Sequence, residues 1–212
     1  MIKNIIFDYG NVIFDIDHQL TIKAFQDLGI TQDSSFFSHL QQNPLFDQFE
    51  MGRIDAKEFR EQIRTISQKQ YTDEEIDKAW NTLLIGIRPG YLEYLSELKG
   101  SYQTYLLSNN NEIHYQAIID YLKEYHSVND MSSYFEKDYY SHLMGMRKPN
   151  ADIFEYVITK HKLKVSETLF IDDSPQHIKT AKNLGLQTHL MLRNEDLRTL
   201  IPRLLSLQNH DN

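Results

Sequence analysis

Short runs of consecutive apolar residues recur along this chain, and each run ends at once in polar residues. The first covers residues 5–7 and is followed by Asp8, and the expected strands at 102–107 and 168–171 end in apolar runs that are followed by Ser108 and Asp172. A strand that is buried on both faces has this continuous apolar pattern. Stretches with helical spacing lie between the runs, so the sequence predicts an α/β fold built on a parallel sheet.

The other expected elements follow from the same spacing and from the glycines and prolines that bound them. Further strands are expected near residues 139–141 and 187–192. Helices are expected over residues 91–98, 112–122, 150–161, 175–184 and 195–207.

Residues 19–85 have a different pattern, because apolar residues there recur only at helical spacing. Two segments open with an acidic or hydroxyl residue three positions before a glutamate, Asp55 before Glu58 and Thr72 before Glu75, which is typical of a helix N-terminus. This helical block lies between the first strand and the rest. The sequence therefore predicts one discontinuous α/β domain, residues 1–17 and 86–212, with an inserted all-helical cap domain at 18–85.

Composition excludes several classes of function. The chain of 212 residues has a formal net charge of -8, which disfavours non-specific binding of nucleic acid. It contains no cysteine, which excludes disulfides, thiolate nucleophiles and cysteine-based metal sites. No apolar run is long enough for a membrane span, and Asp8 comes too early for a signal peptide. We expect a cytoplasmic protein that binds neither nucleic acid nor membrane.

Polar side chains follow the expected strands at their carboxyl ends, where ligands bind in open α/β sheets. Asp8, the pair Ser108 and Asn109, Lys148, and the pair Asp172 and Asp173 all belong to this set. Carboxylates that are packed together repel one another unless a cation neutralises them, and oxygen-rich acidic sites suit Mg²⁺. Mg²⁺, Lys148 and the hydrogen-bonding pair would together hold a phosphate group.

Each of these residues also has a purely structural interpretation. Asp8 could be only a turn residue, and Asp172 and Asp173 could cap the helix that begins at Pro175. Ser108 and Asn109 could likewise cap a helix, and Lys148 could be a solvated surface residue.

Over its whole length the chain resembles the haloacid dehalogenase-like (HAD) hydrolases. Four motifs of that family occur in order: Phe7-Asp8-Tyr9-Gly10-Asn11-Val12-Ile13, Leu106-Leu107-Ser108-Asn109, Arg147-Lys148-Pro149 and Phe170-Ile171-Asp172-Asp173. The resemblance is strongest to the branch of bacterial α-D-glucose-1-phosphate phosphatases, which shares the Gly-Asn-Val-Ile opening and the segment at residues 145–149.

The resemblance implies a Rossmann-like core with a helical cap and a magnesium-dependent phosphatase that acts on a small phosphorylated metabolite, such as glucose 1-phosphate. Asp8 would be the nucleophile that forms an aspartyl-phosphate, and Lys148 would steady both nucleophile and phosphate. Ser108 and Asn109 would bind the phosphoryl group. The implied metal ligands are Asp8, the backbone carbonyl of Gly10, Asp173 and, as the less certain member, Asp172.

Two positions depart from the family pattern. Most HAD phosphatases carry a second aspartate, a general acid and base, where this chain has Gly10. Asp15, Asp17 and His18 are candidates for the vacant acid role. His177 stands where the family usually has aspartate or asparagine.

Three alternative functions remain open at this point: a non-catalytic phospho-ligand-binding member of the family, a phosphomutase and a 2-haloacid dehalogenase. Gly10 disfavours the mutase, which needs the acid, and Asp172-Asp173 disfavours the dehalogenase, which needs no metal site. The substrate and the oligomeric state are left open by the sequence.

Overall fold

A five-stranded sheet forms the centre of the computed structural model, which describes residues 1–30 and 45–207. The strand order is β5-β4-β1-β6-β7, and every neighbouring pair is parallel. This confirms the predicted α/β class. The strands are β1 (Asn4–Phe7), β4 (Gln103–Ser108), β5 (Lys137–Tyr140), β6 (Thr168–Asp172) and β7 (Gln187–Leu190).

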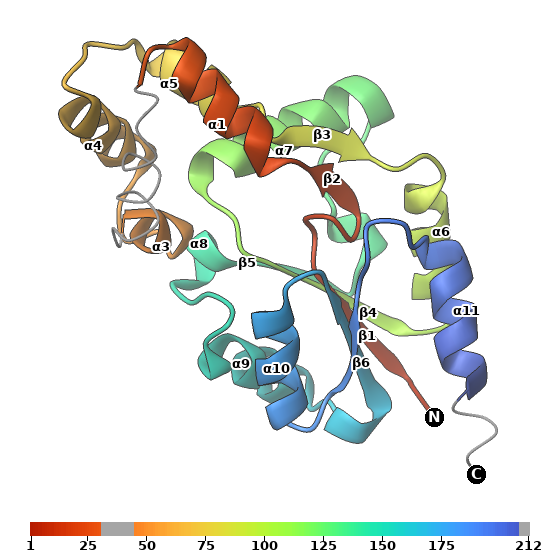
Figure 1. The fold of residues 1–212 in the computed structure, drawn as a ribbon. Helices are drawn as coiled ribbons and strands as arrows, with labels where there is room; N and C mark the ends of the chain where they lie inside the picture. The colour runs from red at the N-terminus through yellow and green to blue at the C-terminus, as the bar shows by residue number, and fades with distance from the viewer. Residues whose placement is uncertain (31–44, 208–212) are drawn as a thin grey trace.

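Helices cover both faces of this sheet. Successive side chains of a strand point to opposite faces, and both faces are apolar here and must be buried. In β1, Ile5 and Phe7 pack in one apolar cluster and Ile6 packs in another. The first cluster includes residues of α6 (Tyr91–Lys99), α7 (Glu112–His126) and α11 (Leu197–Leu207). The second includes residues of α9 (Ala151–His161) and α10 (Pro175–Asn183). The result is a three-layer core (Figure 1).

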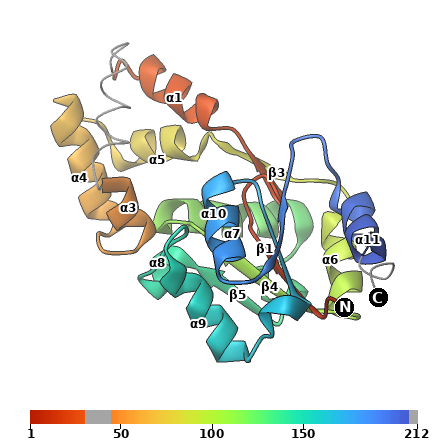
Figure 2. The ribbon, with the colours of Figure 1, turned by 60° about the horizontal axis from the view of Figure 1, so that its bottom comes forward.

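The inserted helices form a separate body at the end of the molecule away from both termini (Figures 1 and 2). They are α1 (His18–Asp27), α3 (Leu45–Glu50), α4 (Ala56–Ser67) and α5 (Asp73–Asn81). Their own apolar cluster is rich in aromatic rings, with Phe49 and Phe59 stacked at 4.3 Å between ring centroids. The predicted helix starts are present: Asp55 caps α4, and Thr72 and Glu75 form a complete capping box on α5.

A short antiparallel pair connects the two bodies, and the sequence did not predict it. It consists of β2 (Phe14–Ile16) and β3 (Leu84–Ile87), on either side of the cap helices. The cap boundary predicted at 85/86 falls inside β3, and residues 31–44 of the predicted cap lie outside the described residues. The exact domain limits therefore stay a prediction.

Three further short elements complete the described fold. They are the helix α8 (Ser141–Met144) and the 3₁₀ turns η1 (Ser132–Tyr134) and η2 (Val165–Glu167). Across the described residues, every helix is too short or too polar to cross a membrane.

Candidate active site at the carboxyl ends of the strands

Three charged side chains meet at the carboxyl ends of β1 and β6. The Lys148 ammonium lies 2.7 Å from Oδ1 of Asp8 and 2.7 Å from Oδ2 of Asp172. The Lys148 and Asp172 side chains are completely buried, and the Asp8 side chain is 10% exposed. The parallel pairing of β1 with β6 brings the two aspartates to the same edge, so the predicted convergence of these residues is observed.

The charges in this cluster do not balance. Asp8 has a pKa raised to about 8, chiefly by burial and by the Asp172 carboxylate, against the opposing effect of Lys148. Burial acts to raise the pKa of Asp172, but Lys148 and His177 outweigh it and hold that pKa below its ordinary range. Lys148 is raised in pKa because Asp172 and Asp8 outweigh the effect of burial. One buried cation thus compensates one carboxylate, and Asp8 is left in excess.

Asp172 is already surrounded by donors. His177 Nδ1 lies 2.9 Å from each of its oxygens, and the Ser174 backbone N–H donates to Oδ1 at 2.7 Å. Asp8, Asp172 and His177 each offer a ligand atom, and these atoms lie within 4.8 Å of one another. However, the Nδ1 of His177 faces the carboxylate rather than an open space. The contacts therefore favour a supporting role for both Asp172 and His177.

A hydrogen bond links Asp173 to the turn after β1. Asp173 is half-buried, and its Oδ2 accepts a hydrogen bond from the Asn11 side chain at 2.9 Å. Gly10 lies in the same turn. Within the described residues, both hydrogen-bonding contacts of the Asp8 carboxylate go to Oδ1, from Lys148 and from the Tyr9 backbone N–H. Oδ2 of Asp8 is thus left for a ligand.

Ser108 and Asn109 close the site at the end of β4, but their side chains do different things. The Asn109 side chain both accepts from the Lys148 backbone N–H and donates to the Lys148 carbonyl, each at 2.9 Å. It therefore holds the lysine backbone in place. The Ser108 hydroxyl makes one long bond, 3.3 Å, to the Asn109 carbonyl. A cavity of about 60 Å³ opens beside Gly10, Ser108 and Asn109.

The three residues considered for the acid role are engaged elsewhere or exposed. Asp15 forms an ion pair with Arg88 at 2.8 Å. Asp17 is the N-cap of α1, and its carboxylate accepts from the Gln19 backbone N–H at 2.9 Å. His18 is an exposed residue of the first turn of α1.

Sequence reasoning missed the contacts that hold the cap against this site. Arg147, the neighbour of the buried lysine, donates to Glu50 at 2.9 Å and pairs with Asp47 at 2.6 Å, and both acids belong to the cap helix α3. On the opposite side, the ring of Trp80 in α5 stacks on His114 of α7 at 4.8 Å. No local pattern signals these pairs, because the partners are far apart in the chain.

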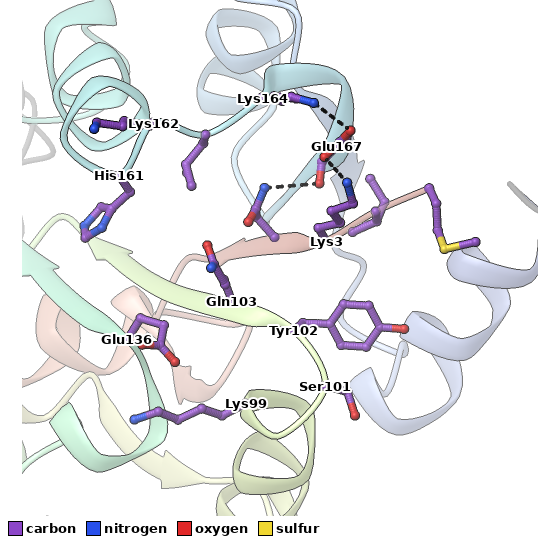
Figure 3. Close-up of a pocket in the computed structure, with 14 residues that line it drawn as sticks. Lys3, Lys99, Ser101, Tyr102, Gln103, Glu136, His161, Lys162, Lys164 and Glu167 are labelled. Carbon is purple, nitrogen blue, oxygen red and sulfur yellow. Dashed lines mark hydrogen bonds and ion pairs between the residues drawn. The ribbon is translucent and has the colours of Figure 1, made fainter.

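A large cavity lies at the opposite end of the sheet (Figure 3). It has a volume of about 710 Å³ and is lined by several lysines. Lys3 and Lys164 both pair with Glu167, and Lys99 donates to the carbonyls of Ser133 and Phe135. Helices α6 and α9 end at this face, where basic residues stabilise the C-terminal ends of helices. These lysines thus have a structural explanation.

Comparison with known proteins places this geometry in a family. The model of the haloacid dehalogenase-like hydrolases matches residues 2–185. A D-ribitol-5-phosphate phosphatase of Bacteroides thetaiotaomicron is 35% identical over 89% of this chain and 91% of its own length. A sesquiterpene phosphatase of Aspergillus oryzae is 28% identical over 87% of each chain.

Solved structures agree with the sequence comparison. A HAD family enzyme of Bacteroides thetaiotaomicron, in complex with magnesium and inorganic phosphate, has a TM-score of 0.86 and 36% identity over 94% of this chain and 99% of its own. A HAD-like hydrolase of Porphyromonas gingivalis has a TM-score of 0.84 and 32% identity, over 97% of this chain and 98% of its own. An L-2-haloacid dehalogenase of Xanthobacter autotrophicus shares the fold. Its TM-score is 0.60 and its identity is 20%, over 97% of this chain and 83% of its own. The chain belongs to the haloacid dehalogenase-like hydrolases.

Proposed function

We propose that this protein is a magnesium-dependent phosphatase of small phosphorylated metabolites, acting in the cytoplasm on sugar or sugar-alcohol phosphates. The observation that carries the proposal is the buried Asp8 carboxylate, which Lys148 holds by one oxygen while the other is left for a ligand. Membership of the HAD-like hydrolases and the resemblance to named phosphatases support it.

The residues present fit a magnesium ion. Two carboxylates share the single buried cation, and burial together with the Asp172 carboxylate raises the pKa of Asp8. Carboxylate and carbonyl oxygens are the ligands that Mg²⁺ prefers. Asp8, Asp173 and the carbonyl of Gly10 would hold the ion. When bound, it would neutralise charge between the Asp8 carboxylate and the phosphate.

The proposed reaction has two steps. Asp8 attacks phosphorus, the bond from phosphorus to the ester oxygen breaks, and a water molecule supplies the proton with which the ester oxygen leaves as an alcohol. Water then attacks phosphorus in the aspartyl-phosphate, which releases inorganic phosphate and restores Asp8. Lys148 keeps Asp8 oriented throughout, and the Ser108 hydroxyl at the end of β4 donates to the phosphoryl oxygens.

The side chain of Ile16 packs closely beside Gly10, the position where the family usually has the acid. A Cβ at position 10 would lie 2.9 Å from Cδ1 of Ile16, so the tip of that side chain would have to turn aside. We expect Gly10→Asp to destabilise the fold by about 1 kcal/mol, the lower end for overpacking, because only the flexible tip of Ile16 is in the way. Adding Ile16→Val, which deletes Cδ1, is expected to recover most of the loss in urea unfolding. A Gly10→Asp variant as stable as wild type would show that Ile16 does not hinder a side chain at position 10.

Burial of Asp8 predicts how magnesium binding depends on pH. Because the pKa of Asp8 is about 8 in the folded protein, against an ordinary value of 3.8, the ion must displace a proton below pH 8. We expect Mg²⁺ affinity to rise by up to about tenfold per pH unit between about pH 6 and 8. The metal-free fold should lose stability as the pH rises from 3.8 to about 8. In this range the folded state binds more protons than the unfolded state.

Calorimetry in buffers of different ionisation enthalpy measures this proton release. The Asp8→Asn variant is the control, since it removes the titrating group. Magnesium binding by wild type that shows no proton release and no pH dependence would contradict the assignment of Asp8.

A substrate panel tests the proposed substrate class. D-ribitol 5-phosphate is the first candidate, on the similarity to the Bacteroides enzyme. α-D-Glucose 1-phosphate tests the branch suggested by the sequence motifs, and p-nitrophenyl phosphate reports generic activity. We expect the highest kcat/KM for a linear five-carbon polyol phosphate. A higher kcat/KM for glucose 1-phosphate than for ribitol 5-phosphate would contradict this expectation. Saturable binding without turnover of any ester would support the non-catalytic alternative.

A further inference from the structure

Asn11 adopts an unusual backbone conformation next to the nucleophile. Its φ is 55°, and the only other non-glycine residues with positive φ in the described structure are Gln68, Ser127 and Lys162. Those three end helices α4, α7 and α9 as their C-caps, where the left-handed conformation is common. Asn11 alone of these residues adopts it in a turn outside any helix. Asparagine tolerates the conformation better than most residues, and an amide side chain there can serve a second purpose.

Both ends of that side chain are used. Nδ2 donates to Oδ2 of Asp173 at 2.9 Å, and Oδ1 accepts from the Ile16 backbone N–H in β2 at 3.2 Å. The Asn11 backbone N–H also donates to the Phe14 carbonyl at 2.8 Å, which closes the turn. One residue thus connects the acid at the end of β6 with the first strand of the β2–β3 pair that leads to the cap.

Asp173 depends on this contact for its orientation. In residues 1–30 and 45–207, no side chain other than that of Asn11 hydrogen-bonds to Asp173. Its neighbour Asp172 is fixed by Lys148, Ser174 and His177, whereas Asp173 is fixed by Asn11 alone. The amide occupies Oδ2 and leaves Oδ1 of Asp173 for a cation.

We propose that Asn11 is a positioning residue, which orients the Asp173 carboxylate for the cation and fixes it to the β2–β3 connection. The inference rests on the proposed function, since it takes Asp173 as a ligand of Mg²⁺. Partners that orient metal ligands through hydrogen bonds change metal affinity by about 10–100-fold when they are removed. Asn11 therefore sets the affinity for the ion without touching the substrate.

The test compares Asn11→Gly with wild type. Glycine accepts the positive φ, so the variant loses the amide without added backbone strain. Lys162→Gly is the matched control, because it makes the same kind of change at a helix C-cap far from the site. Mg²⁺ binding is measured by calorimetry without substrate, and the Mg²⁺ concentration for half-maximal turnover is measured separately.

We expect Asn11→Gly to weaken Mg²⁺ binding about 10–100-fold and to raise the half-maximal concentration equally. The value of kcat at saturating Mg²⁺ should stay within a few-fold of wild type, and Lys162→Gly should bind Mg²⁺ normally. Unchanged Mg²⁺ affinity in a folded Asn11→Gly variant would overturn the inference and leave the proposed function intact. Absence of Mg²⁺ binding by wild type would overturn both.

Discussion

Replacing Asp8 with asparagine is expected to abolish turnover, with a loss in kcat on the order of 10⁶, as when the nucleophile of a covalent mechanism is removed. Asparagine has the same shape but cannot attack phosphorus. The variant should nevertheless fold, because it removes a buried carboxylate whose pKa is raised by burial and by Asp172. We therefore expect the metal-free variant to melt at a higher temperature than wild type at pH 8.

Asp138→Asn is the matched control for this substitution. The Asp138 side chain on β5 is 10% exposed, as is that of Asp8, but it pairs with Lys137 at the beginning of that strand. Its amide variant should retain activity. Turnover by a pure Asp8→Asn protein within tenfold of wild type would exclude Asp8 as the nucleophile.

Replacing Lys148 with methionine is expected to remove both stability and activity. The lysine is completely buried between two carboxylates at 2.7 Å, and methionine fills similar space without the charge. Removing one member of a buried ionic cluster costs about 3–5 kcal/mol, because the remaining charges are left uncompensated. At about 2–4 °C per kcal/mol for a chain of this size, the melting temperature should fall by roughly 6–20 °C.

Added Mg²⁺ should restore part of this stability but not the turnover, because the ion neutralises Asp8 while the lysine that orients the nucleophile is missing. Lys137→Met is the control, since the Lys137 side chain is 55% exposed and its pair with Asp138 is long at 3.5 Å. A Lys148→Met protein as stable as wild type would mean that the buried charges do not interact as the geometry indicates. Calorimetric melting with and without Mg²⁺ measures both effects.

The sequence predicted the sheet and the convergence of the charged residues because both follow from local patterns. Continuous apolar runs identify buried strands, and parallel strands bring their carboxyl ends to one edge. Asp8, Ser108 and Asp172 therefore had to meet, and Lys148 was placed by its motif. Helix starts such as Thr72 were equally local and equally predictable.

What the sequence could not supply are the pairings between distant residues. The side chain of Asn109 holds the backbone of a residue 39 positions away, a contact that no local pattern indicates, and its binding of phosphate stays a prediction. The contact from Asn11 to Asp173 spans 162 positions, and the pair of Asp15 with Arg88 spans 73. The β2–β3 pair was missed for the same reason, since it joins two very short strands across the whole cap. No period in the sequence encodes such contacts.

The most direct test of the central claim is the hydrolysis of p-nitrophenyl phosphate by wild type in Mg²⁺, after EDTA, and after Mg²⁺ is added back. The account predicts turnover with Mg²⁺, its loss on chelation and its return on re-addition, all absent in Asp8→Asn. Turnover that is indifferent to EDTA, or a folded protein that binds Mg²⁺ and phosphate and hydrolyses no ester, would contradict it.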